Sequence, residues 1–294
     1  MVTGGAGFIG SHVVEALLAR GDDVLVIDDL SAGKRENVPD GARLQTADVR
    51  EPLDQHFEGA EACFHLAAQA DVRVAVERPD FDADVNIVGT VRVLEAARAH
   101  HAQVVFASTG GAIYGECDRP APEAAERRPL SPYGVSKLAG EEYLAAYNRL
   151  YATNHVSLRY GNVYGPRQDP KGEAGVVAIF LGALARGETP RIFGEGTQTR
   201  DYVYAADVAR ATLAAVGKAG VFNVGTGIET SVLELYDLCR RVADAQTEPE
   251  LAPPRLGELE RSVLDISLAE RELCWRPEVG LEGGLRLTWD SLLR

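Results

Sequence analysis

Cysteine is scarce in this sequence. Only four cysteines occur among 294 residues, and no two of them form a C-x-x-C pair. Structural zinc and redox sites need closely spaced ligands, and no grouping of His, Cys, Asp and Glu has that spacing. We therefore expect no metal and four reduced thiols, which is the usual state of cysteines in a cytoplasmic protein.

Positive charge is also in short supply. The chain has 30 Lys and Arg against 44 Asp and Glu, a net charge of −14. Nucleic acids attract basic surfaces, so the deficit argues against a nucleic-acid partner. No apolar run approaches the ~20 residues of a membrane span. No basic leader with an apolar stretch is seen either, so we expect neither a membrane partner nor a signal peptide.

A glycine-rich turn stands near the start of the chain, after a very short apolar lead. Gly4, Gly7 and Gly10 are spaced G-x-x-G-x-x-G, helically spaced apolar residues follow, and "DVLVIDD" is a continuous apolar run typical of a buried parallel strand. Such a turn lets the backbone approach a pyrophosphate at a helix N-terminus. Asp28, at the end of the next strand, can accept both ribose hydroxyls of an adenosine and would repel a 2′-phosphate. These features predict an NAD site.

Strands and helices alternate in the rest of the first half. We expect strands at 42–49, 61–67, 103–109 and 154–165, and helices at 83–100 and 131–152. The alternation predicts an α/β fold with a doubly wound parallel sheet (Rossmann) over residues 1–165.

A loop rich in Gly and Pro follows Gly165. We expect residues 166–294 to form a smaller, discontinuous α/β lobe that binds the substrate, with helices at 175–186 and 231–243. Segments 201–203 and 221–224 are candidates to return to the first sheet.

The motif "SPYGVSK" places Tyr133 and Lys137 four residues apart, on one face of a helix. A free tyrosine titrates near ~10, but an adjacent ammonium or an oxidised nicotinamide favours the phenolate. The pair therefore predicts a general base tuned towards working pH. Ser108 and Thr109 end the apolar strand "VVFAST", where small hydroxyl groups are well placed to contact a ligand. By itself Tyr-x-x-x-Lys is common; its order after the glycine-rich turn and the Ser-Thr strand end strengthens it.

Taken together, these motifs resemble the extended short-chain dehydrogenase/reductase family, in its NAD-dependent epimerase/dehydratase branch, and most of all the UDP-glucose 4-epimerases. The resemblance extends over nearly all of the chain and is carried by "TGGAGFIG", "VIDDLSAG", "ADVR", "FHLAA", "VNIVGT", "STGGAIYG", "YGVSK", "LRYGNVYGPRQ", "TRDYVYAADVA" and "PPRLGELERSVLD". It implies Tyr133 as the base, Lys137 on the nicotinamide ribose, and a Ser or Thr on the carbon-4 oxygen of the sugar.

Which residue supplies that hydroxyl depends on the alignment of the loop. Counting forward from Phe106 gives Thr109, whereas counting back from Tyr114 gives Gly110. The second glycine resembles a one-residue insertion, so we choose Thr109, with Ser108 as support.

The resemblance also implies the residues that contact each ligand. For NAD, besides Tyr133 and Lys137, they are Gly4, Gly7, Phe8, Ile9, Gly10, Asp28, Asp29, Ala32, Gly33, Asp48, Val49, Leu66, Ala67, Ala68, Asn86 and Tyr160. For a UDP-sugar they are Thr109, Asn162, Val177, Phe193, Arg200, Tyr202, Arg255, Glu258 and Ser262. Arg200 and Arg255 would clamp the diphosphate, because planar guanidinium donors suit phosphate oxygens.

The absence of a carboxylate just after Thr109 limits the reactions that this site is expected to catalyse. Related dehydratases carry an Asp-Glu pair just after this threonine and related decarboxylases a Glu, whereas this chain has Gly110, Gly111 and Ala112. Elimination of water needs an acid to protonate the leaving hydroxyl. The resemblance therefore implies epimerisation at carbon 4 of a UDP-hexose, through a transient 4-keto intermediate.

Several readings stay open beside this one. In the family, a small residue at the place of Ser262 goes with acceptance of N-acetylhexosamines, so the resemblance raises the hypothesis that this chain accepts them as well. A decarboxylase, a dehydratase or a uronic-acid epimerase remains an alternative, as does a non-catalytic NAD-binding regulator, which the intact Thr109, Tyr133 and Lys137 disfavour. The family also implies a homodimer formed by helices 83–100 and 131–152.

Overall fold

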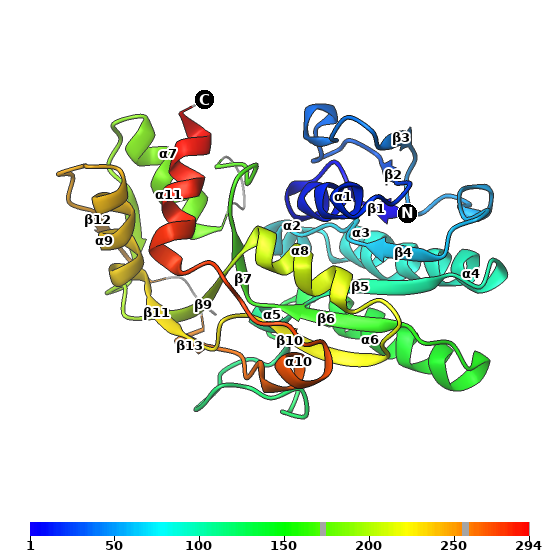
Figure 1. Cartoon of the computed structure of the whole chain (residues 1–294). Coiled ribbons are helices and arrows are strands. Elements are labelled where there is room, and N and C mark those ends of the chain that lie inside the picture. The colour runs from blue at the N-terminus through cyan, green and yellow to red at the C-terminus, as the bar shows by residue number, and fades with distance from the viewer. Residues whose placement is uncertain (171–174, 255–258, 294) are drawn as a thin grey trace.

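The computed structural model describes residues 1–170, 175–254 and 259–293. Two lobes lie side by side, and the N-terminal lobe is built on the larger sheet (Figure 1). That sheet has seven parallel strands in the order β10-β6-β5-β4-β1-β2-β3. The predicted doubly wound α/β fold is therefore confirmed. The strands are β1 (Val2–Thr3), β2 (Leu25–Asp28), β3 (Arg43–Thr46), β4 (Ala62–His65), β5 (Gln103–Thr109), β6 (Val156–Tyr160) and β10 (Gly220–Val224).

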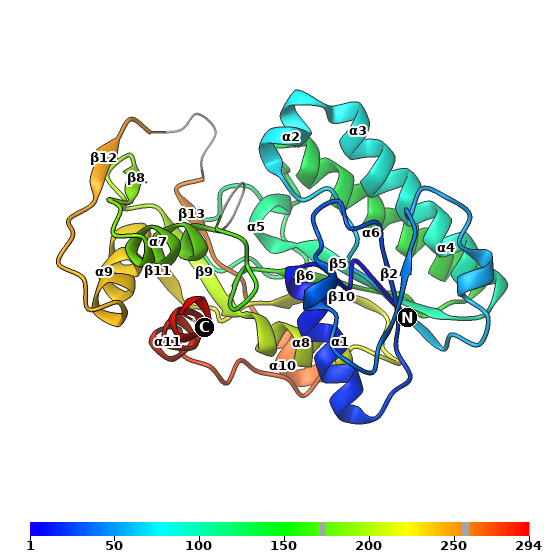
Figure 2. The ribbon, with the colours of Figure 1, turned by 90° about the horizontal axis from the view of Figure 1, so that it is seen from above.

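Helices cover both faces of this sheet (Figure 2). One face carries α1 (Phe8–Arg20), α8 (Ala205–Ala214) and α10 (Ser267–Glu272), which close a core of aliphatic and a few aromatic side chains. The opposite face carries α2 (Val72–Glu77), α3 (Pro79–Ala83), α4 (Gly89–Ala99) and α6 (Pro132–Tyr151). A π-helical turn, η3 (Asp84–Val88), interrupts the helix expected at 83–100. Short helical turns η1 (Arg35–Asn37), η2 (Asp54–His56) and α5 (Gly110–Ile113) complete the lobe.

The segment 201–203 does not return to the large sheet, and that expectation is corrected. It lies in β9 (Thr199–Tyr204), at the centre of a second sheet with β7 (Asn162–Tyr164), β11 (Glu229–Ser231) and β13 (Arg261–Ser262). The cause is a break at Gly161, which separates β6 from β7 within the strand expected at 154–165. A Cβ at Gly161 would lie 2.9 Å from the carbonyl oxygen of Asp201, so the glycine lets β9 approach closely. The segment 220–224 forms β10, at the edge of the large sheet.

The second lobe completes its core with helices from the C-terminal half. α7 (Val176–Ala185), α9 (Val232–Val242) and α11 (Leu281–Leu292) pack around buried aromatic side chains, and β8 (Arg191–Phe193) pairs with β12 (Glu250–Ala252). No helix within the described ranges is long and apolar enough to cross a membrane.

Candidate active site

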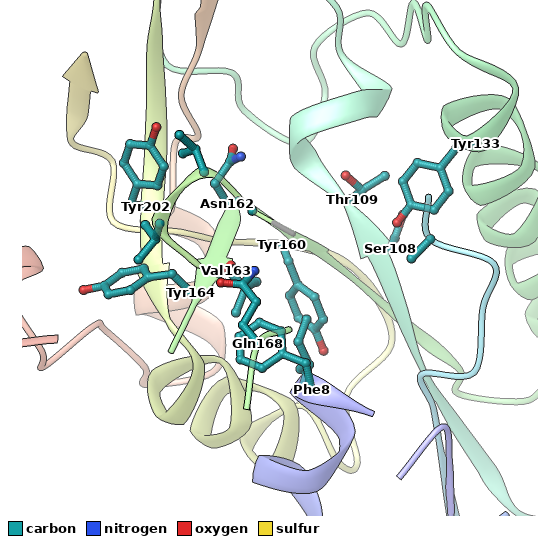
Figure 3. Close-up of a pocket in the computed structure, with 16 residues that line it drawn as sticks. Phe8, Ser108, Thr109, Tyr133, Tyr160, Asn162, Val163, Tyr164, Gln168 and Tyr202 are labelled. Atoms are coloured by element: carbon teal, nitrogen blue, oxygen red, sulfur yellow. Dashed lines mark hydrogen bonds between the residues drawn. The ribbon is translucent and has the colours of Figure 1, made fainter. Parts of the chain in front are cut away.

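A cavity of about 280 Å³ opens where the two lobes meet, at the carboxyl ends of β5 and β6. Ligands bind at this edge of open α/β sheets, because the loops that follow the strands converge there. Figure 3 shows Tyr133 beside Ser108 and Thr109 on one side, with Asn162 and Tyr202 opposite. The lining residues are Phe8, Ile9, Ala70, Ser108, Thr109, Tyr133, Tyr160, Gly161, Asn162, Val163, Tyr164, Gln168, Gly175, Val176, Val177 and Tyr202.

The glycine-rich turn has the shape that a pyrophosphate needs. Gly4 has a φ of 70°, and a Cβ there would lie 2.5 Å from the backbone nitrogen of Ala67, while a Cβ on Gly10 would collide with the carbonyl oxygen of Gly4. The N-cap of α1 is Gly7, no side chain caps this end, and the first turn has no acidic residue. The free N–H groups and the helix dipole therefore suit an anion.

The residues expected around the adenosine lie at the ends of β2 and β3. Asp28 is 7% exposed, and its carboxylate accepts hydrogen bonds from the backbone of Ala6 and Leu30, both at 2.9 Å. Burial raises the pKa of Asp28. A Cβ on Gly33 would come within 2.7 Å of this carboxylate, so the glycine keeps its surroundings open. Asp29 is exposed and accepts from Ser31.

The remaining residues expected to contact the cofactor lie on neighbouring loops. The loop after β4, Leu66 to Ala68, runs beside Gly4, and the Ala67 backbone N–H donates to the Thr3 hydroxyl at 3.3 Å. Asn86 holds this loop in place by two hydrogen bonds to the backbone of Gln69. Asp48 forms an ion pair with Arg50 at 2.5 Å, whose hydrogen bonds lower the pKa of Asp48. Val49 is buried, and Ala32 is exposed in the loop before Gly33.

Helix α6 brings Tyr133 and Lys137 to the cavity. Ser131 caps the helix by accepting from the backbone of Gly134, with Pro132 in the first turn. Lys137 is 3% exposed; its Nζ donates to the Ala107 carbonyl at 2.9 Å and lies 6.0 Å from the Tyr133 ring centroid. Burial lowers the pKa of Lys137 to about 8, against the effect of Asp82 and Glu141.

The expected tuning of Tyr133 towards neutral pH is not found in the protein alone. Burial, followed by the negative charge of Asp82, raises the pKa of Tyr133 above that of a free tyrosine. The Lys137 ammonium is directed at a backbone carbonyl rather than at the phenol oxygen. A positive charge next to the phenol would favour its ionised form, and an oxidised nicotinamide has that charge.

The two hydroxyl residues at the end of β5 differ in their surroundings. Ser108 is 4% exposed and donates to Glu141 Oε1 at 2.5 Å. Glu141 in turn forms a buried ion pair with Arg159 at 2.6 Å, in which both side chains are 2% exposed. Thr109 is only partly buried and lines the cavity. The geometry thus favours Thr109 for contact with a ligand, because the Ser108 hydroxyl already donates its proton to Glu141.

The residues expected to contact a UDP-sugar are divided among several elements. Asn162, Val177 and Tyr202 line the cavity. Ser262 is 6% exposed and pairs with Arg200 across β13 and β9. Phe193 ends β8, on the same lobe. Arg255 and Glu258 lie outside the described residues.

Tyr160 is one of the residues expected to contact NAD. Its ring lines the cavity, but its hydroxyl is hydrogen-bonded to Thr212 Oγ1 at 2.8 Å, inside the protein. The ring of Tyr160, rather than its hydroxyl, is therefore the part that faces the cavity.

Sequence reasoning missed part of the lining. Gln168 is the main polar example; its amide donates to the Val163 carbonyl at 3.2 Å. It stands in "YGPRQ", one of the motifs that carry the resemblance, so that motif was the available signal. The other missed residues are Ala70, Gly161, Val163, Tyr164, Gly175 and Val176.

Comparison with known proteins adds to this geometry. The family model described as "NAD dependent epimerase/dehydratase family" matches residues 1–225. A UDP-glucose 4-epimerase from Mycolicibacterium smegmatis is 48% identical over 98% of this chain and 96% of its own length.

Two solved structures are also similar along almost the whole chain. A UDP-glucose 4-epimerase from Thermotoga maritima, crystallised with UDP-glucose, has a TM-score of 0.97 at 46% identity, covering 99% of this chain and 97% of that one. A UDP-glucose 4-epimerase from Thermus thermophilus, in complex with NAD, has a TM-score of 0.94 at 47% identity, covering 99% and 98%.

Proposed function

The chain belongs to the NAD-dependent epimerase/dehydratase family, and on that basis we propose that it interconverts the two configurations at carbon 4 of a UDP-hexose. UDP-glucose and UDP-galactose are the proposed pair. The observation that carries the proposal is that Thr109 and Tyr133 line one cavity, with Lys137 one helical turn beyond Tyr133. Relatives and structures named as UDP-glucose 4-epimerases support it over the whole chain.

The proposed chemistry needs few groups from the protein. NAD, when bound, supplies the acceptor and donor of a hydride. Tyr133 removes the proton of the carbon-4 hydroxyl, while the Thr109 hydroxyl holds that oxygen and Lys137 holds the nicotinamide ribose. The sugar, now a transient 4-ketone, turns its other face towards the cofactor, and Tyr133 returns the proton to the oxygen.

The loop after Thr109 supports epimerisation over elimination. Among the described residues, a Cβ at Gly111 would meet only Asn162 Oδ1, at 3.5 Å, and Thr109 Oγ1, at 3.9 Å, so a side chain there would enter the cavity. A Cβ at Gly110 would instead collide with Leu264. An acid at 111 would therefore reach the sugar, and glycine leaves that space without one.

Substrate binding is proposed to depend on the nucleotide. A sugar that must turn over cannot be held tightly, so the binding energy has to come from the part that stays in place. Arg200 and Arg255 are the proposed diphosphate ligands, with Asn162 beside them. Ser262 on β13 is paired with Arg200 on the neighbouring strand β9. Its small side chain is proposed to leave room for a 2-acetamido group.

Incubation with UDP-galactose without added NAD tests the proposal. Formation of UDP-glucose on copurified NAD, without accumulation of NADH, is the expected result, because epimerisation regenerates its cofactor. Net NADH would indicate a dehydrogenase, and no turnover would reject the activity. UDP-GlcNAc and UDP-glucuronate complete the panel. Turnover of UDP-GlcNAc that is lost in Ser262→Tyr, while UDP-galactose is still converted, would assign the sugar range to Ser262.

We further propose a homodimer in the cytoplasm. Support for the dimer comes from the outer face of α6, where Val135, Tyr143, Leu150 and Tyr151 are 51%, 42%, 72% and 49% exposed. The four unpaired cysteines agree with a reducing compartment. Light scattering on the purified protein would measure the assembly directly.

A further inference from the structure

Helix α6 carries the proposed catalytic residues Tyr133 and Lys137, and we call it the catalytic helix. A buried acid that the proposed chemistry does not use lies on α3, which packs against this helix. Asp82, on α3, is 0% exposed. Its Oδ1 accepts from Gln69 Nε2 at 3.1 Å and Asn86 Nδ2 at 3.0 Å, and its Oδ2 accepts from the Ser136 hydroxyl. All three partners donate, an arrangement that suits the ionised carboxylate.

These three partners join two parts of the site. Ser136 directly precedes Lys137 on α6. Gln69 and Asn86 are bonded to each other, because the Gln69 backbone N–H donates to Asn86 Oδ1 at 2.9 Å and Asn86 Nδ2 donates to the Gln69 carbonyl at 2.8 Å. Asp82 therefore connects the catalytic helix to the loop after β4.

The charge of Asp82 is not neutralised by a direct ion pair. Among the described residues, no Lys or Arg lies within ion-pair distance of this carboxylate, and a buried charge without compensation is costly. The buried cation that acts on the same region is Lys137, whose ammonium contacts a carbonyl oxygen. Both Asp82 and Glu141 favour its charged form, but Glu141 is already paired with Arg159. Asp82 is the carboxylate left to balance Lys137.

We propose that Asp82 is a positioning residue of this site, which acts through its neighbours on α6: it holds Ser136 and serves as the counter-charge of the Lys137 ammonium. The inference rests on the proposed function and deepens it. The titratable and charged groups that face Lys137 are Tyr133 and Glu141 on α6, Asp82 on α3 and His65 on β4; Glu141 is in turn paired with Arg159 on β6.

Asp82→Asn isolates the charge. The Asn Oδ1 still accepts from Gln69 and Asn86, and its Nδ2 donates to Ser136 Oγ, so all three hydrogen bonds survive with one reversed. A nearby negative charge favours the protonated forms of both Lys137 and Tyr133, so its removal lowers both pKa values. Both the rise of kcat at low pH and its fall at high pH should move to lower pH, by about one unit.

A second readout does not depend on turnover. Ultraviolet absorbance reports tyrosinate, and the difference between each protein and its Tyr133→Phe counterpart isolates Tyr133. The Tyr133 titration should also move to lower pH in Asp82→Asn. Asp82→Glu, which keeps the charge, should leave both readouts at the wild-type pH even if kcat falls. Asp80→Asn makes the same change on the same helix at an exposed position and should move neither.

The outcomes separate the two proposals. If the wild type does not convert UDP-galactose, the proposed function fails. If the wild type is active and a folded Asp82→Asn keeps both the kcat profile and the Tyr133 titration in place, only the role of Asp82 is rejected. Asp82→Ser removes the charge in a smaller volume and takes the place of Asp82→Asn if that variant does not fold.

Discussion

The phenol of Tyr133 illustrates the site at the scale of single residues. Within the protein alone its pKa is raised by burial and by Asp82, so the group is neutral at physiological pH. The positive charge of an oxidised nicotinamide beside the phenol would favour its ionised form, which suits the base that we propose. The neighbouring Lys137, whose pKa burial lowers to about 8, places its ammonium 6.0 Å from the Tyr133 ring centroid.

Tyr133→Phe should reduce kcat by about 10²–10⁴-fold, because it removes the proposed general base and little volume. Binding of UDP, measured by calorimetry, should stay within about twofold of the wild type. A Phe variant with near-normal turnover of UDP-galactose would show that another group takes the proton.

Thr109→Val and Ser108→Ala should separate the two hydroxyl residues. Thr109→Val should lower kcat by about tenfold or more, since a transition-state hydrogen bond is lost, with little change in thermal stability. Ser108→Ala should mainly destabilise the fold, because the Glu141 carboxylate loses a buried donor. The reverse pattern, in steady-state kinetics and thermal melting, would mean that Ser108 contacts the sugar.

At the scale of elements, helix α6, which carries Tyr133 and Lys137, is held by contacts along its length. Ser131 caps its start, Ser136 bonds to Asp82 on α3, and Glu141 binds Arg159 on β6. Arg159 also donates to Tyr114 at 2.7 Å, which continues the network to the loop after β5. These buried polar contacts therefore fix the position of the helix, and with it the positions of Tyr133 and Lys137.

Glu141→Gln should destabilise the protein by about 3–5 kcal/mol, since it leaves the Arg159 guanidinium buried without its counter-charge. Chemical denaturation measures the change. Glu142→Gln is the matched control: Glu142 is 53% exposed in its ion pair with Arg127, and its loss should cost at most about 1 kcal/mol. Equal effects of the two variants would contradict the structural role of the buried pair.

At the scale of the whole molecule, buried histidines make the fold sensitive to acid. Burial lowers the pKa of His65 to about 3 and that of His155 to about 4, below the value of about 6.5 in an unfolded chain. The unfolded state therefore binds more protons than the folded state between those values. Their contribution to stability is fully present above pH 6.5 and is lost as the pH falls.

The free energy of unfolding should fall below about pH 6.5, by about 1.4 kcal/mol per pH unit for each of these histidines. In His155→Asn the amide oxygen still accepts from the Val104 backbone N–H. Between pH 6.5 and pH 4, the free energy of unfolding of this variant should depend on pH less steeply than that of the wild type, by the contribution of one histidine. His101→Asn, at an exposed position with a φ of 57° that Asn tolerates, is the control. An unchanged slope in His155→Asn would rule out this origin of acid sensitivity.

The sequence by itself determined the features that repeat or lie close together along the chain. Alternating strands and helices specify the large sheet, three glycines at fixed spacing specify the turn, and a four-residue spacing puts Tyr133 and Lys137 on one helix face. These patterns are local, so the physics that produces them acts within a few residues.

Only the tertiary structure decided the features that depend on distant partners. Ser108 is withdrawn from the ligand by Glu141, 33 residues away, and Ser136 meets Asp82, 54 residues away. Likewise, β9 pairs with β7 instead of joining the large sheet, although its short apolar run fits either. Such contacts leave no periodic trace in the sequence, because what selects them is the burial of charge and backbone between segments that meet only after folding.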